Sequence, residues 1–256
     1  MYFGLSEDQI FFQDNVKKFL EDQAPLDIVK KIVEGNSSEI KDQLHQGLVN
    51  LGINNILVPE ENDGLGLDLL FATAISQSLG SSIATLPFIG PYVMAPIAIR
   101  HGASRKQKNN LFEGMSNNSI NFGIGFSEYF GSRDSSGITF SKNKVNGKTL
   151  FVLDSDYATH VLLCDNTGKI GIVSLDSKGV EAIDLTTVDK TRIYKEMCFN
   201  NTPIEILEDT KNSTEAIDKS IDAGRIVVSA DSVGASQTMI DKAVEYSKER
   251  KQFNRV

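Results

Sequence analysis

Apolar residues recur at helical spacing in the first part of the chain. One stripe follows a capping-box pattern, Ser6 with Gln9, and runs through Ile10, Phe12, Val16, Phe19 and Leu20. The same spacing predicts helices over residues 38–51, 69–79, 90–101 and 105–113, joined by segments that carry proline and glycine. The pattern therefore predicts an N-terminal α-helical domain over residues 1–118.

The middle of the chain consists of short β-branched and aromatic runs separated by turns. Eight such runs follow one another: INFGIGF, GITFS, TLFVLD, THVLLCD, KIGIVSL, VEAIDL, RIYKEMCF and PIEIL. Asn146 and Gly147 form the dipeptide that is typical of a tight hairpin turn. We expect a middle antiparallel β domain, barrel-like or sandwich-like, over residues 119–212.

The last part of the chain returns to a helical pattern. No proline occurs from Ala216 to Arg255, which predicts one helix of roughly 40 residues, and Lys248 and Gln252 favour its continuation toward the end. Its middle, GRIVVSADSVGASQTMI, is apolar on nearly every side, so other helices must cover it. Residues 213–256 are expected to be the first long helix of an incomplete C-terminal helical bundle, in a fragment or in a chain that depends on a partner. The fold class is α+β with several domains.

Charge and composition exclude several classes of protein. The chain has 256 residues, a net charge of −8 and a pI near 5.0, and thus lacks the basic field that general nucleic-acid binding requires. Its most apolar region, residues 71–99, is interrupted by Pro87, Pro91 and Pro96, which argues against a membrane span. The N-terminus lacks the pattern of a signal peptide. We expect a cytoplasmic protein whose Cys164 and Cys198 are reduced core residues.

Motifs for common catalytic chemistry are not found. His45, His101 and His160 are scattered and have no cysteine or carboxylate at ligand spacing, so no metal site is predicted. The segment GIGFSE lacks the third glycine of a dinucleotide-binding turn. The order helical domain, β domain, long helix is more informative than any of these short motifs.

Four segments in this order resemble signatures of the acyl-CoA dehydrogenase family, and the resemblance covers the whole chain. They are LGINNILVPEENDGLGLD, HGASRKQKNNLFEG, NGKTLFVLDSDYAT and YSKERKQFNR. The resemblance implies FAD as cofactor, an acyl-CoA thioester as substrate and an electron-transferring flavoprotein as electron acceptor. It also implies a homo- or hetero-oligomer, either a dimer or a tetramer.

The resemblance further implies a reaction. A glutamate removes the α-proton of the acyl chain while N5 of FAD accepts the β-hydride, and the product is a 2-enoyl-CoA. Hydrogen bonds to the thioester oxygen stabilise the developing enolate. The length and branching of the acyl chain are left open.

Positions that match the family motifs have implied roles. Backbone groups of Ile124, Gly125, Phe126 and Ser127 would line the flavin, and the ring would lie against Phe151, Val152 and Leu153. Ser132 would lie near flavin and CoA, and Asp222 and Arg225 would contact CoA. The FAD pyrophosphate of a neighbouring subunit would be reached by Arg250, Gln252 and Phe253.

Local statistics offer simpler interpretations of several of these residues. On helix statistics alone Arg250 is better explained as a solvated charge than as a ligand, and only the family match reverses this. Phe151 fits equally well as a core residue of a strand. Asp222 and Arg225 lie three residues apart on a helix and match a weak surface ion pair.

The chain departs from the family pattern at important positions. Leu153 lacks the hydroxyl usually offered to the flavin, and Tyr129 and Asn254 replace the usual proline and glycine. The family's commoner catalytic glutamate lies in C-terminal helices, and its alternative position is Gly224 here, so no catalytic base is identified. Two interpretations besides a dehydrogenase remain open: a non-catalytic structural subunit of a heteromeric acyl-CoA dehydrogenase, and a simple acyl-CoA-binding or lipid-binding module.

Overall fold

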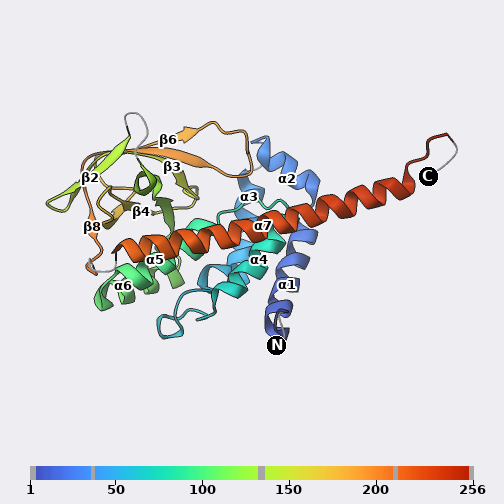
Figure 1. The fold of residues 1–256 in the computed structure, drawn as a ribbon, viewed down its shortest axis with the longest axis horizontal. Coiled ribbons are helices and arrows are strands. Elements are labelled where there is room, and N and C mark those ends of the chain that lie inside the picture. Colours follow the sequence, from blue (N-terminus) through green and yellow to red (C-terminus); the bar gives the residue numbers. More distant parts are fainter. Residues whose placement is uncertain (1–3, 36–37, 132–135, 210–212, 254–256) are drawn as a thin grey trace. The chain divides into compact units, whose positions relative to one another are not determined.

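The computed structural model describes residues 4–35, 38–131, 136–209 and 213–253 (Figure 1). The chain divides into two compact units. The first unit comprises Met1–Leu51, Leu70–Thr85 and Ile226–Val256, and the second comprises Gly52–Leu69 and Leu86–Arg225. The domain boundaries expected from the sequence, at residues 118 and 212, stay a prediction.

The first unit is helical. It contains α1 (Glu7–Gln23), α2 (Leu26–Val33), α3 (Ser38–Asn50), nearly all of α4 (Leu69–Ser81) and the second part of α7 (Ser213–Glu249). The predicted capping box is confirmed, because Ser6 Oγ accepts from Gln9 N at 3.2 Å and Gln9 Oε1 accepts from Ser6 N at 2.8 Å. The stripe on α1 is narrower than expected, since Ile10 is 42% exposed. Helix α2, which starts directly after Pro25, was not predicted.

Helices α4 and α7 approach each other closely within this unit. A Cβ atom added at Gly80 would overlap the carbonyl oxygen of Asp231, and one added at Gly234 would overlap that of Gln77. Two hydrogen bonds join the same helices, from Ser76 Oγ to the Val227 carbonyl at 2.6 Å and from Thr238 Oγ1 to the Ser81 carbonyl at 2.9 Å. Small residues thus allow two backbones to pack in direct contact.

The second unit is built on one sheet of eight strands. These are β1 (Phe122–Gly125), β2 (Gly137–Ser141), β3 (Lys144–Leu153), β4 (His160–Cys164), β5 (Ile170–Ser174), β6 (Val180–Leu185), β7 (Tyr194–Pro203) and β8 (Glu205–Ile206). Their order is β6-β7-β3-β1-β4-β5-β8, and β2 pairs with β3. All eight predicted strands are confirmed. The expectation of a purely antiparallel domain is wrong for one pair, because β1 and β4 run parallel, which makes the sheet mixed.

Short helices accompany the sheet in this unit. They are η1 (Ile53–Asn55), η2 (Glu60–Asn62), η3 (Ile89–Met94), α5 (Ala95–Gly102), α6 (Arg105–Ser116) and η4 (Ser127–Phe130). The expected helix over residues 90–101 is in fact a π-helical turn, η3, followed by α5. Pro91 and Pro96 remove two backbone donors from this segment, which is consistent with the change of helix type.

Helix α7 is continuous over 37 residues, as expected (Figure 1). It ends at Glu249, however, and the expectation that it continues through Gln252 is wrong. Exposed apolar residues line its second part, including Ile226, Val228, Val233, Met239 and Ile240. Among the helices of the described ranges, none combines the length and the apolar character needed to cross a bilayer.

Gln107 links α6 to the sheet, and its removal should weaken this unit. Its Nε2 donates to Glu205 Oε1 at 2.8 Å and to the Ile206 carbonyl at 3.0 Å, while its Oε1 accepts from Glu208 N at 2.9 Å. We expect Gln107→Leu to lower the free energy of unfolding by about 2 kcal/mol, because these three hydrogen bonds of the buried side chain are lost. Urea denaturation measures this loss, and a change below about 0.5 kcal/mol would contradict it.

Candidate functional site

The structure brings together the two segments expected to line a flavin. Strand β1 lies between β3 and β4, and its Ile124 is the register partner of Leu153 at the end of β3. The side chains of Ile124 and Phe126 are buried, and a Cβ at Gly125 would come within 2.8 Å of Leu163 Cδ2. These residues can therefore present only backbone groups to a ligand, and their expected place at a flavin stays a prediction.

Phe151 lies in a bulge of β3. Its φ is 56°, and the register with β7 shifts between Thr149 and Val152. The bulge turns the Phe151 ring outward to 41% exposure, whereas the neighbouring Val152 is fully buried in the sheet core. The alternative interpretation of Phe151 as a core residue is therefore wrong. Its ring lies edge-on to Tyr194, with 6.5 Å between centroids, and leaves an aromatic surface that suits a flat ligand.

Glu128 connects the end of β1 to β3, and sequence reasoning missed it. The side chain is 4% exposed, and its Oε2 accepts from Thr149 Oγ1 at 2.6 Å. Ser127 Oγ lies 2.8 Å from the same carboxylate oxygen and 2.6 Å from the Leu150 carbonyl. The available signal was an acidic residue directly after an apolar strand. Because the Ser127 hydroxyl bonds within the protein, the backbone of Ser127 is the part best placed to meet a ligand.

Asp154 follows Leu153 and holds the start of η3. It is 7% exposed, and its Oδ2 accepts from Gly90 N at 2.8 Å. Burial raises the pKa of this carboxyl above its usual range, and the nearby Arg192 and the backbone N–H groups of Gly90 and Phe88 oppose that rise only in part. The π-helical turn is thereby tied to the strand that carries Phe151 and Leu153.

Because the pKa of Asp154 is higher in the folded state than in the unfolded state, its contribution to stability is largest at low pH. That contribution is lost as the pH rises from about 4 through the raised pKa. We expect Asp154→Asn, which keeps an acceptor for Gly90 N, to remove this part of the pH dependence. Urea denaturation at several pH values should show the variant gaining stability relative to the parent as pH rises. A constant difference would contradict the assignment.

Asp222 and Arg225 lie on α7 and form an ion pair, with 3.0 Å between Oδ1 and Nη1. Both side chains are about two-thirds exposed, at 66% and 65%, so they remain accessible to a ligand. Gly224 between them faces the opposite way and is buried, since a Cβ there would come within 2.9 Å of Met94 Sδ. The alternative family position of the catalytic base is therefore a buried glycine packed against Met94, and it has no side chain that could accept a proton.

Three further predicted residues, Arg250, Gln252 and Phe253, follow the end of α7 at Glu249. Arg250 donates to Tyr246 Oη at 2.7 Å, and its guanidinium lies 5.7 Å from the centroid of the same ring. Gln252 is exposed, and Phe253 is 97% exposed with a φ of 51°. Ser132 lies outside the described residues. The proposed roles of these residues stay predictions.

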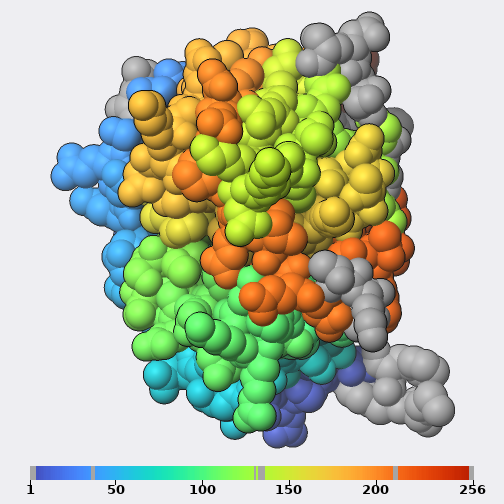
Figure 2. Space-filling model, turned by 90° about the vertical axis from the view of Figure 1, so that its left-hand side faces the viewer, coloured from blue at the N-terminus to red at the C-terminus, as the bar shows by residue number. Residues whose placement is uncertain are grey.

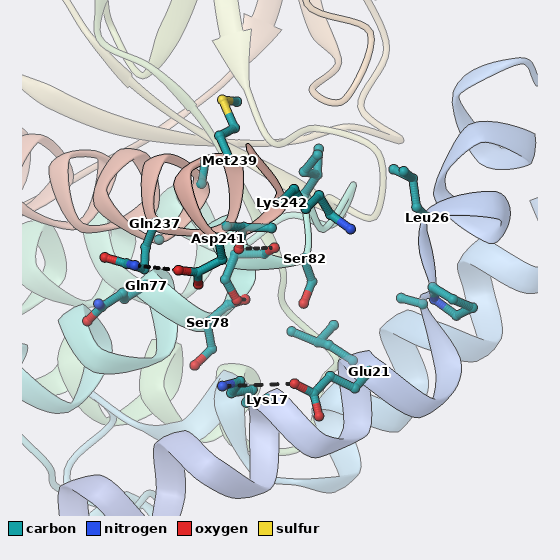
Figure 3. A pocket seen from close by; sticks show the side chains of 18 of the residues that line it. Lys17, Glu21, Leu26, Gln77, Ser78, Ser82, Gln237, Met239, Asp241 and Lys242 are labelled. Atoms are coloured by element: carbon teal, nitrogen blue, oxygen red, sulfur yellow. Dashed lines mark hydrogen bonds and ion pairs between the residues drawn. The ribbon is translucent and has the colours of Figure 1, made fainter. Parts of the chain in front are cut away.

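The helical unit also contains a cavity of about 660 Å³ (Figure 3). Its lining is mostly polar and internally paired: Lys17 lies 3.9 Å from Glu21, and Gln237 donates to Asp241 at 2.9 Å. None of the predicted site residues lines it. Within the described ranges, no group of three or more histidine, cysteine, aspartate or glutamate side chains is placed to hold a metal ion.

The sequence and the fold of the chain are similar to those of known proteins. Residues 6–119 match the model of the acyl-CoA dehydrogenase N-terminal domain. The chain is 23% identical to the probable acyl-CoA dehydrogenase YngJ of Bacillus subtilis, over 99% of this chain and 72% of that protein. It is 22% identical to the caffeyl-CoA reductase-Etf complex subunit CarC of Acetobacterium woodii, over 100% of this chain and 72% of that protein.

A solved structure shares the fold. The acyl-CoA dehydrogenase of Bacillus anthracis complexed with FAD superposes with a TM-score of 0.83 at 14% identity, over 98% of this chain and 46% of that chain. That structure therefore shares the fold described above. Residues 6–119 match the acyl-CoA dehydrogenase N-terminal domain, and the chain as a whole is similar in sequence and fold to acyl-CoA dehydrogenases.

Proposed function

We propose that the chain binds FAD and an acyl-CoA thioester and takes part in the α,β-dehydrogenation of the acyl group, or in the reverse reduction. The observation that carries the proposal is the junction of β1 and β3, where Ile124 pairs with Leu153 beside the exposed ring of Phe151. FAD supplies the hydride acceptor in this family.

The residues at the junction fit a flavin ring in specific ways. Backbone groups at the end of β1 offer hydrogen bonds, and the surface of Phe151 and Tyr194 offers apolar contact. Leu153 contributes no hydroxyl, so the ring contacts at this position are apolar. Asp154 and Glu128 act as positioning residues, because each ties the junction to a neighbouring segment.

On the substrate side, we propose that Arg225 binds CoA, with Asp222 orienting its guanidinium. Both side chains are exposed and already paired at 3.0 Å, which limits the conformational freedom lost on binding. An electron-transferring flavoprotein is the proposed electron partner, supported by the Etf complex named for the CarC relative. Oligomer formation, with Arg250 and Gln252 reaching a neighbouring subunit's FAD, belongs to the same proposal.

The glycine at position 224 favours a second candidate function. Because Gly224 has no side chain that accepts a proton, the proton-abstracting base comes from another residue. If a partner chain supplies it, this chain is a non-catalytic subunit of a heteromeric acyl-CoA dehydrogenase. Activity of the homo-oligomer without any partner would exclude this candidate, whereas FAD binding together with activity only after co-expression with a related chain would support it.

Phe151→Ala tests the proposed flavin contact. Because the ring is exposed, the fold should survive its removal, while FAD affinity should fall about tenfold through the loss of apolar contact. Phe11→Ala, which removes an exposed aromatic residue on α1, serves as the matched control. Titration of apoprotein with FAD, followed by flavin fluorescence, measures both. Equal affinity of the parent and Phe151→Ala would count against the site.

A further inference from the structure

A second cavity lies in the unit that contains the sheet, between the turn at η2 and the start of α6. Its volume is about 490 Å³, within the usual range for small-molecule sites. The lining residues are Pro59, Glu61, Asn62, Arg100, Arg105, Lys108, Asn109 and Phe112. None of them belongs to the proposed flavin or CoA site.

The walls of this cavity are fixed by contacts within the unit. The Arg100 guanidinium donates to the Leu57 carbonyl at 2.6 Å, which joins α5 to the segment before the turn. Ser116 Oγ donates to the Asn62 carbonyl and thereby joins α6 to the turn itself. Phe112, only 2% exposed, contributes the buried part of the lining. The cavity is therefore formed before any ligand arrives.

One face of α6, which is green at the surface in Figure 2, supplies half of the lining. Arg105, Lys108, Asn109 and Phe112 follow each other at positions i, i+3, i+4 and i+7 of the helix, so they share one side. Since Phe112 is the buried member of this face, the three polar side chains lie along the rim of the same cavity.

The lining of the cavity is basic in an acidic protein. It contains three cations, Arg100, Arg105 and Lys108, and one carboxylate, Glu61, whereas the whole chain carries a net charge of −8. Within the part of the chain that the structure describes, neither Arg105 nor Lys108 forms an ion pair. Burial lowers the pKa of the neighbouring His101 most, Lys219, Arg100 and Lys108 lower it further, and Glu215 opposes this.

Helix stability does not explain these cations. The first turn of α6 contains no acidic residue, and Arg105 and Lys106 occupy its first two positions. Positive charge at a helix N-terminus opposes the helix dipole and destabilises the helix. Cations in the first turn of a helix are unfavourable for the helix itself. When they lie at a preformed cavity, they are expected to serve ligand binding.

We propose that this cavity binds a small phosphate-bearing anion. Arg105 and Lys108 would contact the phosphoryl oxygens from α6, and the free N–H groups of Arg100 would contact them from α5. Three cations against the one carboxylate of Glu61 favour an anionic ligand, and the planar guanidinium groups suit phosphate geometry. The Asn109 amide supplies a further donor at the rim.

Calorimetric titration of the purified protein with inorganic pyrophosphate at low ionic strength tests the proposal. We expect saturable binding that weakens about tenfold or more in Arg105→Ala/Lys108→Ala. Lys106→Ala is the matched control, because Lys106 has the same charge on the same turn but does not line the cavity; its affinity should stay within about twofold of the parent. The double variant should fold normally, since both side chains lie at the surface. Their positive charges near the N-terminus of α6 oppose the helix dipole, so their removal does not weaken the helix.

Titrations with other anions show which part of a phosphate-bearing ligand the cavity recognises. Tighter binding of adenosine diphosphate than of pyrophosphate would identify a nucleotide as the source of the phosphate, and equal binding would identify the phosphate groups alone; either result supports the site. Absence of saturable binding, equal loss in Lys106→Ala, or equally tight binding of citrate would overturn the proposal. Pyrophosphate binding should persist in Phe151→Ala, so failure of this site and failure of the flavin site are distinguishable.

Discussion

Gly234→Ala is expected to reduce the free energy of unfolding by about 3 kcal/mol or more, because the new methyl group would overlap the Gln77 carbonyl oxygen. The adjacent backbones of α4 and α7 must then separate, which also weakens the hydrogen bonds made by Ser76 and Thr238. Urea denaturation followed by circular dichroism measures the change.

Whether Gly234→Ala lowers or raises the free energy of unfolding distinguishes the contact between α4 and α7 from the effect of helix propensity. Alanine is a better helix former than glycine by about 1 kcal/mol, so helix propensity alone predicts that Gly234→Ala stabilises α7. Ser232→Ala on the same helix is the matched control, since Ser232 is exposed and its hydroxyl donates to the Val228 carbonyl of its own helix. A stability gain in Gly234→Ala, similar to that of the control, would show that α4 and α7 do not make this contact.

Glu128→Ala is expected to destabilise the sheet unit by about 3 kcal/mol, because the hydroxyls of Ser127 and Thr149 lose a buried charged acceptor. It should also weaken FAD binding about tenfold, since the carboxylate fixes the end of β1 against β3 where the flavin is proposed to lie. Thermal unfolding and FAD titration of the apoprotein measure the two effects separately.

Glu181→Ala is the control for this prediction. Glu181 lies on β6 in the same sheet, and its side chain is exposed. The control should change stability by less than about 0.5 kcal/mol and leave FAD affinity unaltered. If Glu128→Ala lost stability but kept the FAD affinity of the parent, Glu128 would be a structural residue without a role in positioning the flavin site.

The fold was largely predictable from local patterns. Strands such as Ile170–Ser174 and the capped helix Glu7–Gln23 have strong signals, because each depends on residues that are near in sequence. The parallel pairing of β1 with β4 depends on contacts between distant segments and has no local signal. The end of α7 at Glu249 was missed for a related reason, since favourable helix propensity at Lys251 and Gln252 does not by itself maintain a helix.

The candidate site was inferred from the family motifs, and the roles of its residues stay predictions. Ile124 and Leu153 were placed at the flavin from matching motifs, and the register of β1 with β3 brings them together. Glu128 and Asp154 were missed because their role depends on burial, which a single charged residue in a sequence does not reveal. Likewise, the packing of Met94 against Gly224 joins positions 130 residues apart by number, and only the fold shows it.

The most direct test of the account is titration of the purified apoprotein with FAD, followed by addition of an acyl-CoA thioester. The account predicts saturable binding of one FAD per chain that Phe151→Ala and Glu128→Ala weaken, and a change in the flavin absorption spectrum when the thioester binds. A protein that binds no FAD, alone or with a related partner chain, would contradict it.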